Sequence, residues 1–233
     1  MIRSIGIAAL GVFAAAAGTS AAAQESWRYE VMPFLWASDI EGREGIRDTV
    51  ADVDASFSDL IEFVDIGAAL RFRAERDPMV WFAETSYVEL GDTARTGIGD
   101  VSVELTQTFA EAGMSYRFAE QLAVYGALRY QKVEAELRAA SGAFRTDADW
   151  LDAVAGLHWT PIRSDSWGVW ARGDLGGGGS DLVWLAEVGA GYRFSPRWAA
   201  YLFYRILDTD YERSGFVYDI EQSGLALGFG FSF

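Results

Sequence analysis

His158 is the single histidine of this chain, and the sequence contains no cysteine. An imidazole can act as the general base of a nucleophilic enzyme, provided that a serine or another nucleophile lies within hydrogen-bond reach. No serine motif of the G-x-S-x-G kind accompanies His158, and no cluster of histidine and cysteine offers a zinc site. We therefore interpret His158 as a structural, inward-facing polar side chain, and the sequence predicts no catalytic residue, no cofactor and no metal.

Carboxylates are densest between residues 39 and 65, where nine acidic residues stand against two arginines. Asp52 and Asp54 suggest a calcium loop, because Ca²⁺ prefers carboxylate oxygens. The spacing departs from an EF-hand loop, which needs a glycine where Phe57 stands and a bidentate glutamate where Phe63 stands. Solvated surface charge is therefore the favoured interpretation of this segment.

Charged residues also recur within apolar stretches, where they alternate with apolar residues. Because successive side chains of a β-strand point to opposite faces, such a stretch has one charged and one apolar face. A paired and hydrogen-bonded charge is tolerated inside a protein, whereas a lone one is costly. The balance of seven arginines and seven acids favours a network that fills an interior, and a narrow conduit is the alternative. The predicted inward-facing charges are Arg71, Arg73, Glu75, Glu84, Glu111, Arg117, Arg129, Asp152, Arg172, Asp174, Glu187, Arg193 and Arg205, together with Glu30.

The same period of two extends over most of the chain. Leu122, Val124 and Leu128 face one way, whereas Tyr125 and Arg129 face the other. Many of the predicted strands exceed the ~9–11 residues that a strand needs to cross a bilayer. The sequence therefore predicts an all-β fold, a transmembrane antiparallel up-and-down β-barrel of ten strands, with eight or twelve as alternatives because residues 46–56 could add a hairpin strand. The expected strands are 27–40, 65–76, 79–92, 101–118, 122–138, 147–161, 166–176, 182–194, 197–212 and 216–233.

Aromatic residues gather at one end of these strands, next to tight turns such as Asp77-Pro78 and Ser195-Pro196. Longer polar loops are expected at the other end, since transmembrane barrels have short periplasmic turns and longer extracellular loops. Aromatic rings settle at membrane–water interfaces, so we predict a periplasmic aromatic girdle and both termini in the periplasm. Nine of the ten residues at these positions are aromatic: Trp27, Phe72, Trp81, Phe118, Leu122, Trp159, Trp167, Phe194, Trp198 and Phe233.

The first 23 residues are typical of a cleaved signal peptide, with Arg3 before an apolar run and Ala21-Ala22-Ala23 before Gln24. We expect residues 24–233 to form the mature barrel, with an acidic extracellular segment over 41–64. The formal net charge of −15 argues against nucleic-acid binding. Beyond the signal, no apolar run reaches 18 residues, which argues against a helical membrane protein.

The chain ends on Leu225, Leu227, Phe229, Phe231 and Phe233, which alternate with small residues. This ending resembles the C-terminal signature of bacterial outer-membrane proteins, which the barrel assembly machinery recognises. The whole predicted barrel is similar in architecture to small barrels of the OmpA and OmpW kind. Further segments that resemble small, functionally uncharacterised proteobacterial outer-membrane proteins are Pro33–Ser38, Asp52–Leu60 and Gly215–Asp219.

The resemblance implies the cell outer membrane as location, and outer-membrane lipid, lipopolysaccharide and the barrel assembly machinery as partners. It carries no characterised activity, and it leaves the oligomeric state open. We therefore expect a structural or surface-interaction role. A narrow gated channel for a small polar or amphipathic solute is the alternative, and a lipid-modifying enzyme is a distant third. Residues 57–63 are typical of a short amphipathic helix, which we expect to fold over the barrel mouth as a lid.

Overall fold

The computed structural model of the protein describes residues 26–46, 49–96, 99–139, 142–213 and 215–233. The predicted signal peptide lies outside these ranges. Nearly all of the described residues belong to one antiparallel sheet. The elements are β1 (Arg28–Ile46), β2 (Thr49–Ala55), α1 (Phe57–Leu60), the 3-10 helix η1 (Ile61–Phe63), β3 (Val64–Arg76), β4 (Met79–Thr96), β5 (Gly99–Ala119), β6 (Leu122–Ala139), β7 (Gly142–Arg163), β8 (Trp167–Gly178), β9 (Leu182–Arg193), β10 (Trp198–Arg213) and β11 (Phe216–Ser232).

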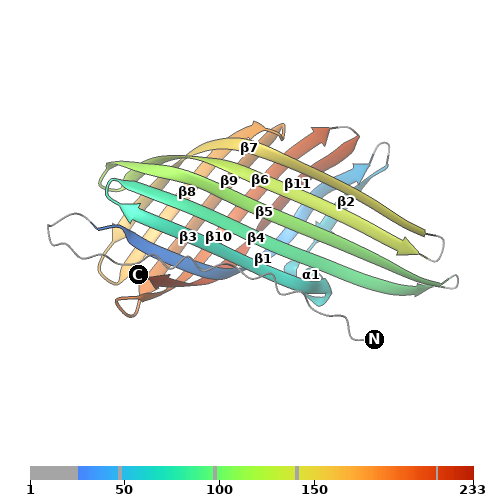
Figure 1. The fold of residues 1–233 in the computed structure, drawn as a ribbon, viewed down its shortest axis with the longest axis horizontal. Coiled ribbons are helices and arrows are strands. Elements are labelled where there is room, and N and C mark those ends of the chain that lie inside the picture. Colours follow the sequence, from blue (N-terminus) through green and yellow to red (C-terminus); the bar gives the residue numbers. More distant parts are fainter. Residues whose placement is uncertain (1–25, 47–48, 97–98, 140–141, 214) are drawn as a thin grey trace.

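The sheet closes into a barrel because its first and last strands pair (Figure 1). β1 pairs with β11 from Glu30 opposite Ser232 to Ile46 opposite Phe216. Its other edge pairs with β3 near one end of the barrel and with β2 near the other. β2 and β3 therefore share one position in the wall, and the predicted ten-stranded antiparallel barrel is confirmed. We call the end that holds Glu30 and Ser232 the turn end, and the opposite end the hairpin end.

The interruption between β2 and β3 is occupied by α1 and η1. No helix in the described ranges, these two included, is long and apolar enough to cross a membrane. The backbone N–H of Phe57 donates to the Asp39 carboxylate on β1 at 2.6 Å. The predicted lid over the mouth is wrong, because α1 contacts β1 and η1 contacts β4. The segment lies instead in the wall, beside β1 residues 35–39, which have no partner in β2 or β3.

The hairpin end differs from the expectation of long polar loops. β4 and β5 stay paired up to Thr96 opposite Gly99, and β6 and β7 up to Ala139 opposite Gly142. These two hairpins project farthest at the right of Figure 1. The hairpin of β8 and β9 is much shorter, since β8 ends at Gly178. Continued pairing satisfies the backbone hydrogen bonds that a loop would leave to water, which explains why the strands extend.

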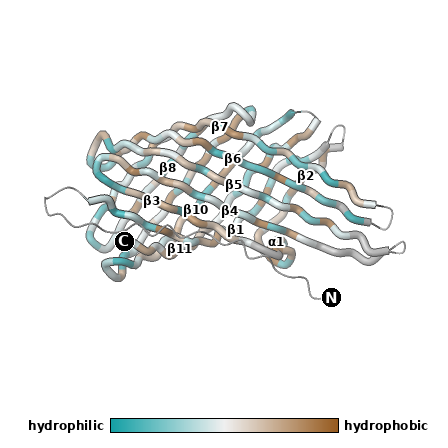
Figure 2. Tube along the Cα trace, viewed as in Figure 1, coloured by the Kyte–Doolittle hydropathy of each residue, from teal (hydrophilic) through white to brown (hydrophobic). Residues whose placement is uncertain are grey.

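The face of the wall that points outward is the apolar one. Leu128 and Leu202 are 55% and 54% exposed, whereas their neighbours Arg129 and Phe203 are 0% and 1% exposed. Figure 2 shows hydrophobic residues along the middle of the barrel and hydrophilic residues towards both ends. A soluble sandwich would bury its apolar face, so this outer surface is suited to lipid.

Candidate functional site

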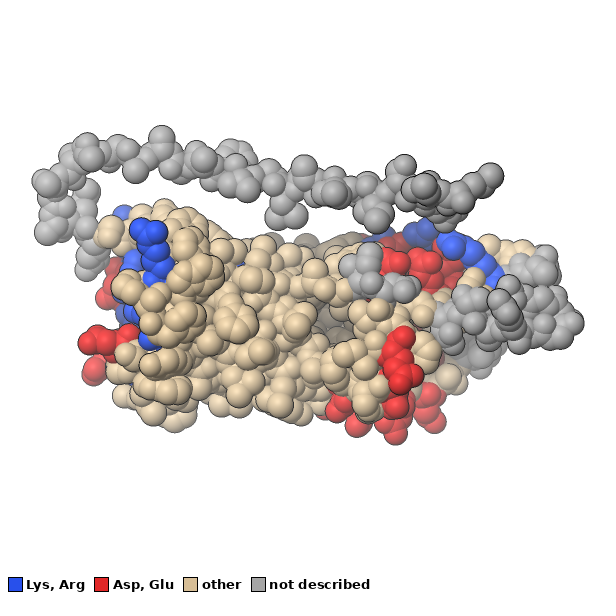
Figure 3. Space-filling model, turned by 90° about the horizontal axis from the view of Figure 1, so that it is seen from below, with Lys and Arg blue, Asp and Glu red and all other residues tan. Residues whose placement is uncertain are grey.

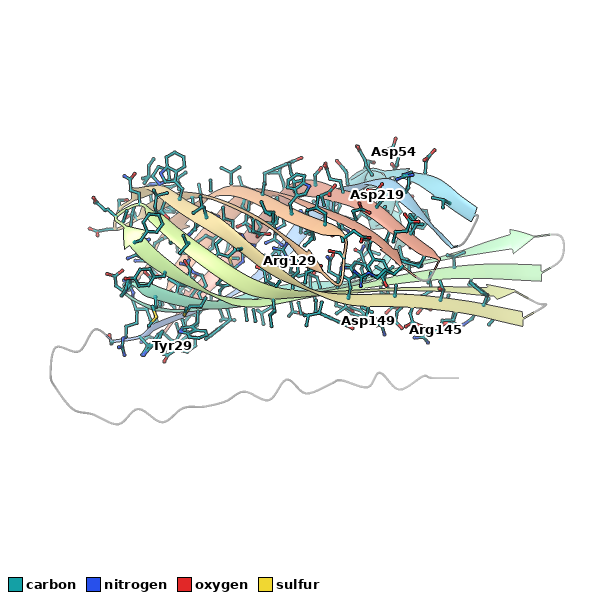
Figure 4. All side chains as sticks on the ribbon, turned by 90° about the horizontal axis from the view of Figure 1, so that it is seen from above. Tyr29, Asp54, Arg129, Arg145, Asp149 and Asp219 are labelled. Carbon is teal, nitrogen blue, oxygen red and sulfur yellow. The ribbon has the colours of Figure 1, made fainter. Side chains whose placement is uncertain are left out.

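A layer of buried charges crosses the middle of the barrel, where Figure 4 labels Arg129. The register of the sheet brings these residues together: Glu84 on β4 lies opposite Arg71 on β3 and Glu111 on β5. In the same way Glu187 on β9 lies opposite both Arg172 and Arg205. The charged layer consists of Arg71, Glu84, Glu111, Arg129, Arg172, Asp174, Glu187 and Arg205.

One half of the charged layer is built on two arginines that share two glutamates. Arg205 donates to Glu84 at 2.5 and 3.1 Å and to Glu187 at 2.7 Å. Arg71 donates to the same two glutamates at 2.6 and 2.8 Å. The side chains of Arg205, Glu84 and Glu187 are 2% exposed or less. Each carboxylate thus has two guanidinium partners, which offset the cost of removing it from water.

The other half is centred on Arg129, whose side chain is fully buried. Arg129 donates to Glu111 at 2.7 Å and to Asp174 at 2.9 Å. Arg172 donates to Glu111 at 3.1 Å and lies 3.6 Å from Glu187, so it links the two halves. With four arginines and four carboxylates, the layer is a charge-balanced network that fills the barrel at this depth.

Apolar side chains fill the lumen between the charged layer and the hairpin end. Trp150 stacks on Tyr211 with 4.5 Å between ring centroids, and it packs at 5.3 Å against Tyr218. This filling was not among the expectations from the sequence, which concerned only the charges on the inward face. The available signal was that Trp150 stands two residues before the inward-facing Asp152, and therefore points the same way. We call these buried residues the apolar plug: Val133, Ala148, Trp150, Tyr218 and Ile220.

Between the charged layer and the turn end, the lumen is hollow. This vestibule has a volume of about 860 Å³ and is lined by residues of both the wall and the turns. Glu75 lies within it, 3.1 Å from Arg117, 3.3 Å from Arg28 and 3.7 Å from Arg163. Basic side chains also gather at this end in Figure 3, at the left, beside acidic ones. Seven arginines line the vestibule against four acidic side chains, which leaves it with an excess of positive charge.

The remaining predicted lumen charges lie outside the charged layer, so the seven arginines and seven acids do not form one network. Asp152 accepts a hydrogen bond from the backbone N–H of Ser180 at 2.8 Å. Glu30 accepts one from the Tyr201 hydroxyl at 2.7 Å. Arg193 is exposed at the turn end and lines the vestibule. Asp152 lies opposite Arg129 on the neighbouring strand, but its recorded hydrogen bond goes to Ser180, whereas Glu30 and Arg193 lie nearer the turn end.

His158 lines the vestibule and lies opposite Arg172 on the neighbouring strand. Among the hydrogen bonds of the described residues, none joins its ring to a hydroxyl group.

The predicted girdle residues lie at the turn end, where Figure 4 labels Tyr29. Trp81 and Trp159 are about half exposed on the outer face. Trp27 is more buried, and the Arg76 guanidinium lies 5.4 Å from its ring centroid. The other girdle positions are all exposed: Phe72, Phe118, Leu122, Trp167, Phe194, Trp198 and Phe233.

The predicted assembly segment forms the outer face of β11. Leu225, Leu227 and Phe229 point outward and are about half exposed. Phe231 stacks on Phe233 with 6.0 Å between ring centroids. The segment thus combines a lipid-facing apolar row with the strand that closes the barrel against β1.

The acidic segment lies largely on strands. Asp52 and Asp54 are exposed on β2, opposite Arg43 and Glu41 of β1. Figure 4 shows Asp54 and Asp219 at the hairpin end. Within the described ranges, no group of three or more histidine, aspartate or glutamate side chains is placed to hold a metal ion. The favoured interpretation of these residues is still solvated charge.

The closed barrel and its lipid-facing surface agree with a comparison against protein families. The family described as the outer membrane protein beta-barrel domain matches residues 5–233. The chain belongs to this family. Its location is therefore the outer membrane. Among curated proteins, none matches the sequence.

Several solved structures of outer-membrane proteins resemble this chain at low sequence identity. The outer membrane protease OmpT from Escherichia coli has a TM-score of 0.50 and 9% identity, covering 92% of this chain and 99% of its own. Ail, the attachment invasion locus protein of Yersinia pestis, has a TM-score of 0.44 and 12% identity, covering 90% and 100%. The toluene transporter TodX of Pseudomonas putida has a TM-score of 0.41 and 12% identity, and the match covers 91% of this chain and 76% of TodX. At these identities the likeness concerns the fold alone.

Proposed function

We propose that this outer-membrane barrel is closed to solutes and has a structural or surface-interaction role. The observation that carries the proposal is the charged layer, in which Glu84 and Glu187 each bind two arginines across the lumen. A permeating solute would have to break these buried pairs, each of which is costly to separate. The rings of Trp150, Tyr211 and Tyr218 add a second barrier towards the hairpin end.

We place both termini of the chain, and with them the turn end of the barrel, in the periplasm. Short turns are typical of the periplasmic side, and the turn end also carries the exposed girdle rings of Trp81 and Trp159. In this orientation the hairpins of β4–β5 and β6–β7 extend towards the cell exterior. Lipid and lipopolysaccharide surround the apolar outer face of the barrel. The outer face of β11, which ends at Phe233, is the element that we expect the barrel assembly machinery to bind.

The surface-interaction role is supported by a row of carboxylates near the hairpin end. Asp54 on β2 lies opposite Glu41 on β1, which lies opposite Glu221 on β11. Glu221 in turn lies opposite Asp208 on β10. Four adjacent strands thus present like charges in one row, a surface that is complementary to a basic partner.

The two other functional hypotheses have less support. A gated conduit requires the charged layer to open, and α1 does not lie over the mouth as a lid. A lipid-modifying enzyme requires a nucleophile beside His158, and His158 faces a vestibule at the turn end, away from the outer leaflet in the proposed orientation.

Conductance of the refolded protein in planar bilayers tests the proposal. Insertion is checked by heat-modifiable gel mobility, and a general porin in the same bilayers serves as the positive control. We expect the wild type to be electrically silent. A variant without residues 57–63 should stay silent as well, because the charged layer does not depend on α1 or η1. Stable, well-defined openings of the wild type would refute the closed barrel.

A further inference from the structure

The lining of the vestibule contains more arginines than a closed barrel needs. Seven arginines line it, against four acidic side chains. One of the four, Glu187, is already neutralised by Arg71 and Arg205 of the charged layer. Another, Glu75, lies within 4.0 Å of Arg28, Arg73, Arg117 and Arg163 together. The cavity therefore attracts anions from the side of the turns.

Arg172 lines this cavity, and two of its nitrogens have no hydrogen-bond partner. Its side chain is 11% exposed, and its Nη1 donates to Glu111 at 3.1 Å. Its Nε and Nη2 are buried without a hydrogen-bond partner. Nη2 lies 3.6 Å from Glu187 and 4.0 Å from Glu84, beyond hydrogen-bond distance. These two nitrogens form one edge of the guanidinium fork, which binds the two oxygens of a carboxylate side by side.

The walls beside Arg172 are apolar and aromatic. Trp170 and Tyr201 line the vestibule with their rings in edge contact, 5.9 Å between centroids. Met32 and Phe82 add apolar surface. A ligand that places an anionic head on Arg172 would bury an apolar body against these rings, and ligand pockets combine a few polar groups with such walls.

We propose that the vestibule binds a small amphipathic organic anion, with its carboxylate paired with the guanidinium group of Arg172 and an aromatic or short aliphatic body against Trp170 and Tyr201. Arg73, which lines the same cavity, adds long-range attraction. The ligand reaches the vestibule from the turn end and stops at the charged layer. This site goes beyond the proposed function, because binding there requires no path through the barrel.

The test is calorimetric titration of the refolded protein in lipid nanodiscs, with empty nanodiscs as the blank. The probe is 4-phenylbutyrate, compared with its neutral amide and with inorganic phosphate. We expect saturable 1:1 binding of the carboxylate. The amide should bind about tenfold or more weakly, since it loses a charge-assisted bidentate pair. Inorganic phosphate should also bind about tenfold or more weakly, because it has no apolar body to bury.

Variants assign the site to Arg172. R172Q should weaken binding of the carboxylate about tenfold or more, and R172K should recover part of it, since lysine keeps the charge but not the fork. R172Q strands no acid, because Glu111 keeps Arg129 and Glu187 keeps Arg71 and Arg205. R73Q should weaken binding severalfold at low salt, through long-range attraction alone. The control R43Q, at the hairpin end, should bind like the wild type.

The proposal is overturned by any of four results. These are the absence of saturable heat from the carboxylate, equal affinity for carboxylate and amide, equal affinity for carboxylate and phosphate, and a folded R172Q that binds like the wild type. If R172Q does not fold, the affinities of R73Q and R43Q are compared instead. Equal affinity of these two variants for the carboxylate at low salt would then overturn the proposal. None of these outcomes depends on conductance, so failure here leaves the closed barrel to its own test.

Discussion

Tyr29 and Phe233 join the first and last strands of the barrel to each other at the turn end. The backbone N–H of Phe233 donates to the carbonyl of Tyr29 at 3.0 Å, and the N–H of Tyr29 donates back at 3.1 Å. Their rings stack with 5.7 Å between centroids. The last residue of the sequence therefore contributes both backbone and side chain to the seam between β1 and β11.

Replacing Phe233 should impair assembly of the barrel. Phe233→Ala removes the ring that stacks on Tyr29 and Phe231 but keeps the backbone hydrogen bonds. We expect less of the variant in the outer-membrane fraction, measured by fractionation and heat-modifiable gel mobility. The control is Phe194→Ala, which removes another exposed ring at the same end but not on the terminal strand. Equal outer-membrane levels of both variants and the wild type would contradict the assembly role.

Removing an arginine of the charged layer should destabilise the barrel strongly. Arg205→Ala takes a guanidinium from both Glu84 and Glu187, which are buried. Breaking such a buried pair costs about 3–5 kcal/mol. The measurement is the urea midpoint of the protein folded in lipid vesicles. Arg43→Ala breaks the exposed pair with Asp219 and should shift the midpoint little. Similar midpoints for the two variants would show that the layer contributes no stability.

Two glycines of the barrel wall should differ in their tolerance of a larger side chain, because their surroundings are packed differently. A Cβ at Gly189 would lie 2.5 Å from the Trp170 ring and 2.6 Å from the Phe203 Cβ. Gly189→Ala should therefore lower the free energy of unfolding by about 1–3 kcal/mol, the range for overpacking. At Gly126 the nearest atom is 3.7 Å away, so Gly126→Ala should be nearly neutral. Equal urea midpoints for the two variants would be inconsistent with this packing.

The tip of the β10–β11 hairpin should become more stable at mildly acidic pH. Asp210 lies opposite Asp219, and burial, followed by the charges of Asp219 and Asp181, raises the pKa of Asp210 above its usual 3.8. The folded state thus holds this proton more tightly than the unfolded state, so stability increases as pH falls through the raised pKa and is lost as pH rises. Amide hydrogen exchange at the tip, corrected for intrinsic rates, should slow as the pH is lowered from 7 to 4.

Two controls belong to this measurement. Asp210→Asn should protect the tip already at pH 7 and remove most of the pH dependence. The β6–β7 hairpin should behave in the opposite way, because hydrogen bonds from Lys132 and then Arg145 lower the pKa of Glu134. Its protection should decrease as pH falls through the usual glutamate range. A parallel change at both hairpins would mean that the two local charges do not control the exchange.

The strands, the apolar outer face and the girdle could all be predicted from the sequence, because they depend on local patterns. Alternation such as Leu122, Val124 and Leu128 against Tyr125 and Arg129 requires only that neighbouring side chains of a strand point to opposite faces. The same local rule places rings such as Trp159 and Trp167 beside tight turns. It also identified every arginine and carboxylate of the charged layer as inward-facing.

Only the tertiary structure decided which of these charges meet. Arg129 pairs with Asp174, 45 positions away, and Arg205 pairs with Glu84, 121 positions away, whereas Arg193 and Glu30 stay outside the layer. The location of α1 in the wall, the apolar plug and the vestibule were decided in the same way. The reason is that alternation determines the face of a residue, but its depth and its neighbours across the lumen depend on the register of all ten strand positions, which is set when the barrel closes.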